Sequence, residues 1–238
     1  MTGQAARARW DSFAERNADQ FAVVLFLVIA TYCLGSLLPF EGWQGVLIGG
    51  FGTFTAVYAL AAAGARARLM PWVLVAAGLE ILATIISAIA DQKQFEGGAA
   101  LVQMLLFLLA ALAVLRAVLT EDHVGGGAIA GAISVYIMLG LLYAFVYVGL
   151  DRIQGDFFGP QAPLQEGDFL FFSMTTLTTT GYGNLVPAGQ PGRMLAALEM
   201  LTGQIFVVTL VARLVTSWQP GEWLRGGAGI SRRRRRDS

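Results

Sequence analysis

Thr178-Thr179-Thr180-Gly181-Tyr182-Gly183-Asn184 is the stretch that decides the fold of this chain. It follows a short apolar segment, residues 169–177, and precedes a long one, so it is expected at membrane depth. Irregular backbone is tolerated there only where it is buried in protein or lines a water-filled path. Glycine permits backbone angles that residues with a Cβ resist, so successive carbonyl groups can turn to one side. Repeated around a symmetry axis, such carbonyls form rings of oxygen that replace the water around a bare cation.

The composition of the 238 residues indicates an integral membrane protein. Hydrophobic residues make up 56%, charged residues only 13%, and the mean hydropathy is +0.63. The formal net charge is zero, so no global excess of charge indicates a nucleic-acid partner. We expect no enzyme, because the chain has one histidine, one cysteine and no nucleophile–base or metal-ligand spacing. The cysteine, Cys33, can form no internal disulfide and is expected to be a small core residue.

Six apolar stretches are each long enough, at about 20 residues, to cross a hydrocarbon core. The shorter segment before the Thr-Gly run is expected to be a re-entrant helix over residues 168–178, with Asp168 as its N-terminal cap. Residues 1–19 lack the apolar core of a cleavable signal peptide, so we expect an interfacial helix there. The six predicted spans are residues 20–38, 45–63, 72–90, 99–119, 127–150 and 193–217.

The basic residues predict an orientation in which both termini are cytoplasmic. With the amino terminus inside, far more of them fall on the inner side than on the outer side. This agrees with the positive-inside rule, by which the cytoplasmic segments of membrane proteins carry most of the basic residues. The outer ones are Lys93, Arg152 and Arg193. A basic run near the carboxyl end either contacts anionic lipid or only reinforces this orientation. The inner ones are Arg7, Arg9, Arg16, Arg66, Arg68, Arg116, Arg213, Arg225 and the run Arg232, Arg233, Arg234, Arg235 and Arg236.

The central stretch resembles the selectivity filter of the potassium-channel superfamily. The pattern Thr-x-Gly-Tyr-Gly of that family is present as Thr179-Thr180-Gly181-Tyr182-Gly183, with a pore helix before it and a polar residue after it. Gly203 lies in the last apolar stretch, about where the family has its inner-helix hinge glycine. The resemblance covers residues 127–218. It implies an all-α membrane protein of six transmembrane helices, a re-entrant pore helix and a filter, assembled as a homotetramer in the cell membrane.

The resemblance also implies which residues carry the function. Potassium, as the permeant ion and not as a cofactor, would bind at Thr179, Thr180, Gly181 and Tyr182, and Gly183 would complete the filter. Thr180 stands at the usual valine position and Asn184 at the usual aspartate position. A weakly selective cation channel therefore stays an alternative, as does a non-conducting receptor or scaffold that uses the pore unit for assembly. The residues expected to support the filter and its outer mouth are Thr175, Thr178, Asn184 and Glu199.

A break at residues 120–127, with three successive glycines, divides the chain into parts. A cytoplasmic segment, 1–19, and a four-helix unit, 20–120, come before the break. The pore unit covers 121–218, and a short basic tail covers 219–238. The fourth span carries only Arg116 near its end, whereas a voltage sensor needs a ladder of charges. We therefore expect a channel that is not steeply voltage-gated.

Three further ionisable residues leave alternatives open. Glu80, near the middle of a span, could pair with Arg116, bond a hydroxyl such as Thr84, or stay protonated, as a switch or as a structural group. Glu199 could face the ion pathway or brace the filter from behind through Thr175 or Thr176. His123, at the break, could titrate near neutral pH or be a bystander.

The loop of residues 151–167 is rich in turn residues and acidic. Such a loop, next to the Thr-Gly run, predicts either a vestibule that raises the local cation concentration or ordinary solvated charges. Its acidic residues are Asp151, Asp156 and Glu166, which outnumber Arg152, and Asp168 follows directly.

Overall fold

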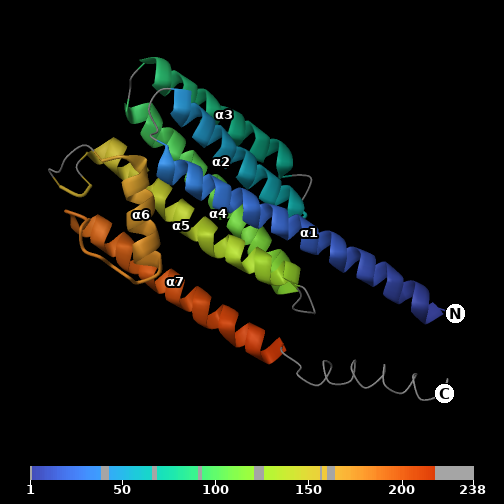
Figure 1. Ribbon diagram of the computed structural model, residues 1–238. Helices are drawn as coiled ribbons and strands as arrows, with labels where there is room; N and C mark the ends of the chain where they lie inside the picture. The colour runs from blue at the N-terminus through green and yellow to red at the C-terminus, as the bar shows by residue number, and fades with distance from the viewer. Residues whose placement is uncertain are drawn as a thin grey trace.

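A computed structural model of the chain describes residues 2–38, 43–65, 69–90, 93–120, 126–155, 157–159 and 164–217. Within these ranges the chain is all-helical (Figure 1), as the sequence predicted, and six helices are long and apolar enough to cross a membrane. His123 and the rest of residues 121–125 in the break, Asp156, and the basic tail lie outside the described residues. The helices are α1 (Thr2–Leu37), α2 (Trp43–Ala62), α3 (Met70–Ala90), α4 (Lys93–Thr120), α5 (Gly126–Gln154), α6 (Glu166–Leu177) and α7 (Gln190–Ser217).

The first helix differs from its prediction in length. α1 runs without interruption from Thr2 to Leu37, and only its second part, Asp19–Leu37, is apolar enough to span a membrane. The polar part holds alanine, arginine and glutamate, which are good helix formers, so nothing ends the helix before the apolar part begins. The prediction for Cys33 was wrong, because Cys33 is exposed on α1. A lipid-facing position is as apolar as a core position, and the sequence alone does not separate the two.

Small residues let α4 pack closely along α5 of the same chain. A Cβ atom at Gly149 would lie 3.5 Å from the carbonyl oxygen of Gly97, and one at Gly97 would lie 3.4 Å from that of Gly149. Farther along the pair, the rings of Phe107 and Phe145 stack with centroids 5.8 Å apart. Figure 1 shows both helices next to each other. Within this chain α4 therefore packs on α5 through a close contact in which two glycines face each other.

The short helix α6 lies between α5 and α7 (Figure 1). Its 12 residues extend only about 18 Å at 1.5 Å per residue, too short to cross a hydrocarbon core of about 30 Å. An aromatic cluster fixes it against α5 and the loop that follows α5. The members of this cluster are Tyr147, Phe157, Phe158, Phe169 and Phe172, with neighbouring ring centroids 4.9–6.5 Å apart.

The last helix, α7, is the most exposed of the spans in a single chain. Of its most apolar stretch, Gln190–Arg213, only 17% is buried. An apolar face of this size is covered by lipid or by another protein subunit in a membrane. Large side chains on this face include Met194, Leu198, Leu201, Ile205 and Val208, each at least 46% exposed.

Candidate ion-conduction site

The pore helix α6 begins two residues earlier than predicted. Gln165 is the N-cap residue, and its backbone N–H donates to the Asp168 carboxylate at 2.9 Å. Asp168 is thus the third residue of the first turn and not the cap itself, which corrects the sequence prediction. The sequence could have suggested this, because an acidic residue three positions after the cap is the pattern of a capping box.

Backbone hydrogen bonds tie the Thr-Gly run to the end of α6. The N–H groups of Thr180 and Gly181 both donate to the carbonyl oxygen of Thr175, at 2.8 and 3.1 Å. The N–H of Thr179 donates to the carbonyl of Thr176 at 2.9 Å. Thr175 was predicted to support the filter, and here its backbone oxygen, rather than its hydroxyl, meets the run. The start of the run is therefore a continuation of the helix end.

The backbone of the run alternates in handedness. Thr179, Gly181 and Gly183 have φ angles of +57°, +54° and +77°, and Thr179 is the only described non-glycine residue with a positive φ. Residues that alternate between left-handed and right-handed conformations turn successive peptide groups to the same side of an extended chain. A threonine in this conformation costs on the order of 1–3 kcal/mol, a strain that is typical of functional sites.

Hydroxyl and amide groups surround the inner end of the run. The Thr178 and Thr180 hydroxyl oxygens lie 2.9 Å apart, and the Thr179 hydroxyl donates to the Thr178 carbonyl at 2.7 Å. Gln204 of α7 donates from Nε2 to the Thr179 hydroxyl oxygen at 3.1 Å. The sequence analysis missed Gln204, although it lies next to Gly203. This contact joins the inner helix to the residue expected to supply the innermost oxygen.

Every residue of the run from 178 to 184, Asn184 included, is exposed in the single chain. Tyr182 is 70% exposed, and its ring stacks on that of Phe171 of α6, with centroids 5.7 Å apart. Exposed irregular backbone between membrane-spanning helices must line an aqueous path or be covered by other protein. The run has the geometry of such a lining.

Behind the pore helix, Glu199 of α7 is fully buried and does not face the run. Its Oε2 accepts a hydrogen bond from the Tyr147 hydroxyl at 2.6 Å, and its Oε1 lies 2.5 Å from the Ser173 hydroxyl. Glu199 therefore joins α5, α6 and α7 in one contact. The partners differ from the two threonines that were expected: the Thr175 hydroxyl instead donates to the Phe172 carbonyl at 3.0 Å.

The two short contacts of Ser173 bear on where one proton lies. Its hydroxyl donates to the Gly140 carbonyl at 2.7 Å, and a carbonyl can only accept. Ser173 has one hydroxyl proton, so the short contact with Glu199 is a hydrogen bond only if the carboxyl group donates. The geometry thus fits a protonated Glu199 that donates to Ser173 and accepts from Tyr147.

Gly203 is buried in the middle of α7, which runs through it without a break. A Cβ atom at this position would overlap the carbonyl oxygen of Leu177, the last residue of α6. The structure therefore supplies a packing reason for this glycine in addition to the hinge role that the resemblance implied. The close approach brings the inner helix against the residue directly before the Thr-Gly run.

The acidic residues expected at the outer mouth are partly engaged in ion pairs. Arg152 at the end of α5 pairs with Glu166 at 2.6 Å, with Glu96 at 3.0 Å and with Asp151 at 3.4 Å. Asp168 is used in the capping of α6. We call Arg152 with these three carboxylates the Arg152 cluster. It connects α4, α5 and α6 and leaves fewer free charges for a vestibule than the sequence suggested.

A comparison with protein families matches the part of the chain that holds the Thr-Gly run. Residues 133–219, from α5 to the end of α7, match a protein family described as "Ion channel". The inward rectifier potassium channel Kirbac3.1 of Paramagnetospirillum magnetotacticum is 34% identical over 72 residues, which are 30% of this chain and 23% of that protein. The two pore potassium channel b of Oryza sativa subsp. japonica is 33% identical over 78 residues, 33% of this chain and 20% of that protein.

The matched stretches span less than a quarter of either relative's length. No solved structure gives a significant match. The family match nevertheless falls on the segment that holds the pore helix, the Thr-Gly run and the inner helix, and both relatives are named as potassium channels. Together with six helices suited to span a membrane, these findings indicate a multi-pass membrane protein whose residues 133–219 are similar to ion channels.

Proposed function

We propose that four copies of this chain form a potassium-selective channel that conducts passively across the cell membrane. The carbonyl groups of Thr179, Thr180, Gly181 and Tyr182, with the Thr179 hydroxyl, bind the dehydrated ion, and Gly183 completes the filter. The names of both relatives and the filter sequence support potassium as the ion. One chain carries one filter segment, so a closed ring of carbonyls needs several copies, four in this superfamily.

One observation carries this proposal: the alternating handedness of an exposed Thr-Gly run. Left-handed φ angles at Thr179, Gly181 and Gly183 favour carbonyl groups that point to one side. The exposure of the run in a single chain leaves that side free to meet its symmetry mates. The exposed apolar face of α7 supports the same assembly, because it requires cover by lipid or by another subunit.

The distribution of basic residues supports an orientation with both termini cytoplasmic. The filter then opens to the outside, and the Arg152 cluster lies at the outer ends of α4, α5 and α6. The run from Arg232 to Arg236 is proposed to contact anionic lipid at the inner surface. No cofactor is proposed, because potassium is the transported ion.

Ion flux from the purified full-length protein in liposomes tests the proposal. Potassium flux should exceed sodium flux, and Gly181→Ala should abolish it, because a methyl group opposes the left-handed φ of +54° at this position. Gly78→Ala is the matched control, since a Cβ at Gly78 meets nothing within 4 Å. Equal potassium and sodium flux would instead support the weakly selective channel. No flux from a correctly assembled protein would support the receptor or scaffold.

A further inference from the structure

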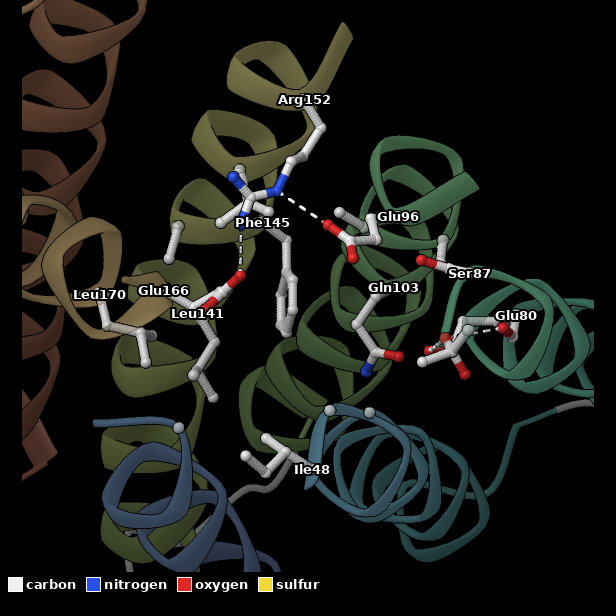
Figure 2. Close-up of a pocket in the computed structure, with 18 of the residues that line it drawn as sticks. Ile48, Glu80, Ser87, Glu96, Gln103, Leu141, Phe145, Arg152, Glu166 and Leu170 are labelled. Carbon is white, nitrogen blue, oxygen red and sulfur yellow. Dashed lines mark hydrogen bonds and ion pairs between the residues drawn. The ribbon is translucent and has the colours of Figure 1, made fainter. Parts of the chain in front are cut away.

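A cavity of about 90 Å³ lies between the four-helix unit and the pore unit, away from the filter (Figure 2). A water molecule needs only about 10–15 Å³ by this kind of measure, so the cavity is large enough for a small ligand. Its lining includes Glu96, Arg152 and Glu166 of the Arg152 cluster and, on the side of the four-helix unit, Glu80, Ser87 and Gln103. The aliphatic and aromatic side chains of its wall are Ile48, Leu141, Phe145, Val148 and Leu170.

Two buried polar groups that line the cavity have no partner. The Ser87 hydroxyl and the Gln103 Nε2 make no hydrogen bond within the described part of the chain. Ser87 is 3% and Gln103 is 1% exposed. A buried polar group without a partner is unfavourable, so these two groups need a ligand or ordered water.

The two short contacts of Thr53 bear on which atom of Gln103 is unsatisfied. Thr53 Oγ1 lies 2.6 Å from Glu80 Oε2 and 2.8 Å from Gln103 Oε1, but its single proton cannot serve two acceptors. One arrangement that resolves this exchanges the O and N atoms of the Gln103 amide, so that Gln103 donates to Thr53 and Thr53 donates to Glu80. The orphan atom of Gln103 becomes an acceptor. The cavity then offers oxygen atoms and requires donors.

Glu80 also has an oxygen that lacks a close partner. Thr84 lies 3.3 Å from Glu80 Oε1, but its hydroxyl is 2.9 Å from the Glu80 backbone carbonyl, which takes its proton. Within the described residues no basic side chain forms an ion pair with Glu80, which is 2% exposed. The hypothesis that Arg116 pairs with it therefore finds no support. A buried carboxylate without a counter-charge is unfavourable.

The charge of the lining is complementary to a cation. Glu80, Glu96 and Glu166 bring three carboxyl groups, whereas Arg152 is the only basic residue of the lining, and it already pairs with two of them. Gly49 keeps the space beside Glu80 open, since a Cβ there would lie 3.2 Å from Glu80 Oε1. A ligand that donates hydrogen bonds, carries positive charge and presents an apolar body to the wall would complement this lining.

We propose that this cavity binds a small organic ammonium ion. Its nitrogen donates to Glu80 Oε1 and to the Gln103 amide oxygen, and its apolar body packs on Leu141, Phe145 and Leu170. Because these last residues belong to α5 and the pore helix α6, occupancy connects the four-helix unit to the helix that supports the filter. This site is separate from the ion-binding run and does not depend on which ion the channel conducts.

Binding of benzylammonium to the full-length protein in detergent tests this site, with the isosteric neutral benzyl alcohol and the bare ammonium ion as comparison ligands. Titration calorimetry should show saturable binding of benzylammonium and binding of the other two at least about tenfold weaker. Bound ligand should also raise the midpoint of thermal unfolding. Binding of the alcohol as tight as that of the amine would overturn the proposal, and so would equal binding of the bare ammonium ion.

Two variants test whether benzylammonium binds in this cavity. Glu80→Gln should weaken benzylammonium binding by at least about tenfold, because it removes the counter-charge. Gly49→Ala should weaken benzylammonium binding, because the added methyl group takes up space beside Glu80. Gly50→Ala is the control: it adds the same methyl group where nothing lies within 4 Å, and it should leave the binding unchanged. Unchanged binding in both Glu80→Gln and Gly49→Ala would place the ligand elsewhere and refute the site. The readout is independent of potassium flux, so a failed channel assignment would not affect it.

Discussion

The α-carbon of Gly203 in the inner helix packs directly against the carbonyl oxygen of Leu177, the last residue of the pore helix. Tyr136 of α5 also approaches this oxygen, with its hydroxyl at 3.4 Å. The end of the pore helix is therefore in contact with both helices of the pore unit. Glycine is the only residue that permits this approach from α7, because the space for a Cβ is occupied by main chain, which cannot move as a side chain can.

Replacing Gly203 by alanine should separate α7 from the end of α6. We expect a loss of potassium flux together with a fall in thermal stability, because overpacking against main chain costs about 1–3 kcal/mol. Flux assays and unfolding curves of the same preparation measure both effects. Gly98→Ala is the control in a helix, since a Cβ there meets nothing within 4 Å. Altered flux with unchanged stability would favour the hinge role alone.

The contact of Glu199 with Tyr147 and Ser173 leads to a prediction about side-chain chemistry. Glu199→Gln should keep flux and stability close to those of the unmodified chain, because an amide can donate to Ser173 and accept from Tyr147. Glu199→Ala should lower the free energy of unfolding by about 2–4 kcal/mol, since it leaves a cavity and unpaired hydroxyl groups. Denaturation curves that follow the loss of assembly compare the stability of the two variants. Equal damage from both substitutions would show that Glu199 acts as a carboxylate.

Conductance should depend only weakly on voltage. Moving one charge through 100 mV is worth about 2.3 kcal/mol, and steep gating uses about 3–4 charges in each subunit. α4 carries Arg116 near its end as its only arginine, and this side chain is exposed. Conductance–voltage curves in symmetrical potassium should therefore be shallow, and Arg116→Gln should leave their slope unchanged. A steep curve in the unmodified chain would contradict this prediction.

Close packing of Gly97 and Gly149 allows a crosslinking test of how the units are connected in the assembly. Cysteines at both positions, in a chain with Cys33→Ser, should form a disulfide within one chain, because each position lies next to the other's backbone. Oxidation followed by denaturing electrophoresis should then show crosslinked monomers. Each single-cysteine variant serves as a control for random pairing. Dimers and larger species that need both cysteines would show that α4 packs on a neighbouring subunit instead.

The sequence predicted the spans and the irregular backbone of the Thr-Gly run, because both depend on local properties of the chain. Apolar length determines a membrane span, and the glycines of the Thr-Gly run determine its unusual backbone angles. The partners of Glu199 could not be predicted, since Tyr147 and Ser173 are 52 and 26 residues away and meet it only through helix packing. The contact of Thr53 with Glu80 could not be predicted either, because it forms only where α2 packs against α3. The exposed position of Cys33 was missed because membrane helices are apolar on both their inner and outer faces.

The exposure of the Thr-Gly run in a single chain has a genetic consequence. In the proposed tetramer each ring of oxygen atoms takes one member from every subunit, so one altered copy breaks every ring it enters. A cell that makes equal amounts of unmodified and Gly181→Ala chains would retain roughly one intact tetramer in sixteen if the chains mix at random. A loss-of-function allele at this position would therefore behave as dominant, whereas a mutation that prevents assembly would behave as recessive.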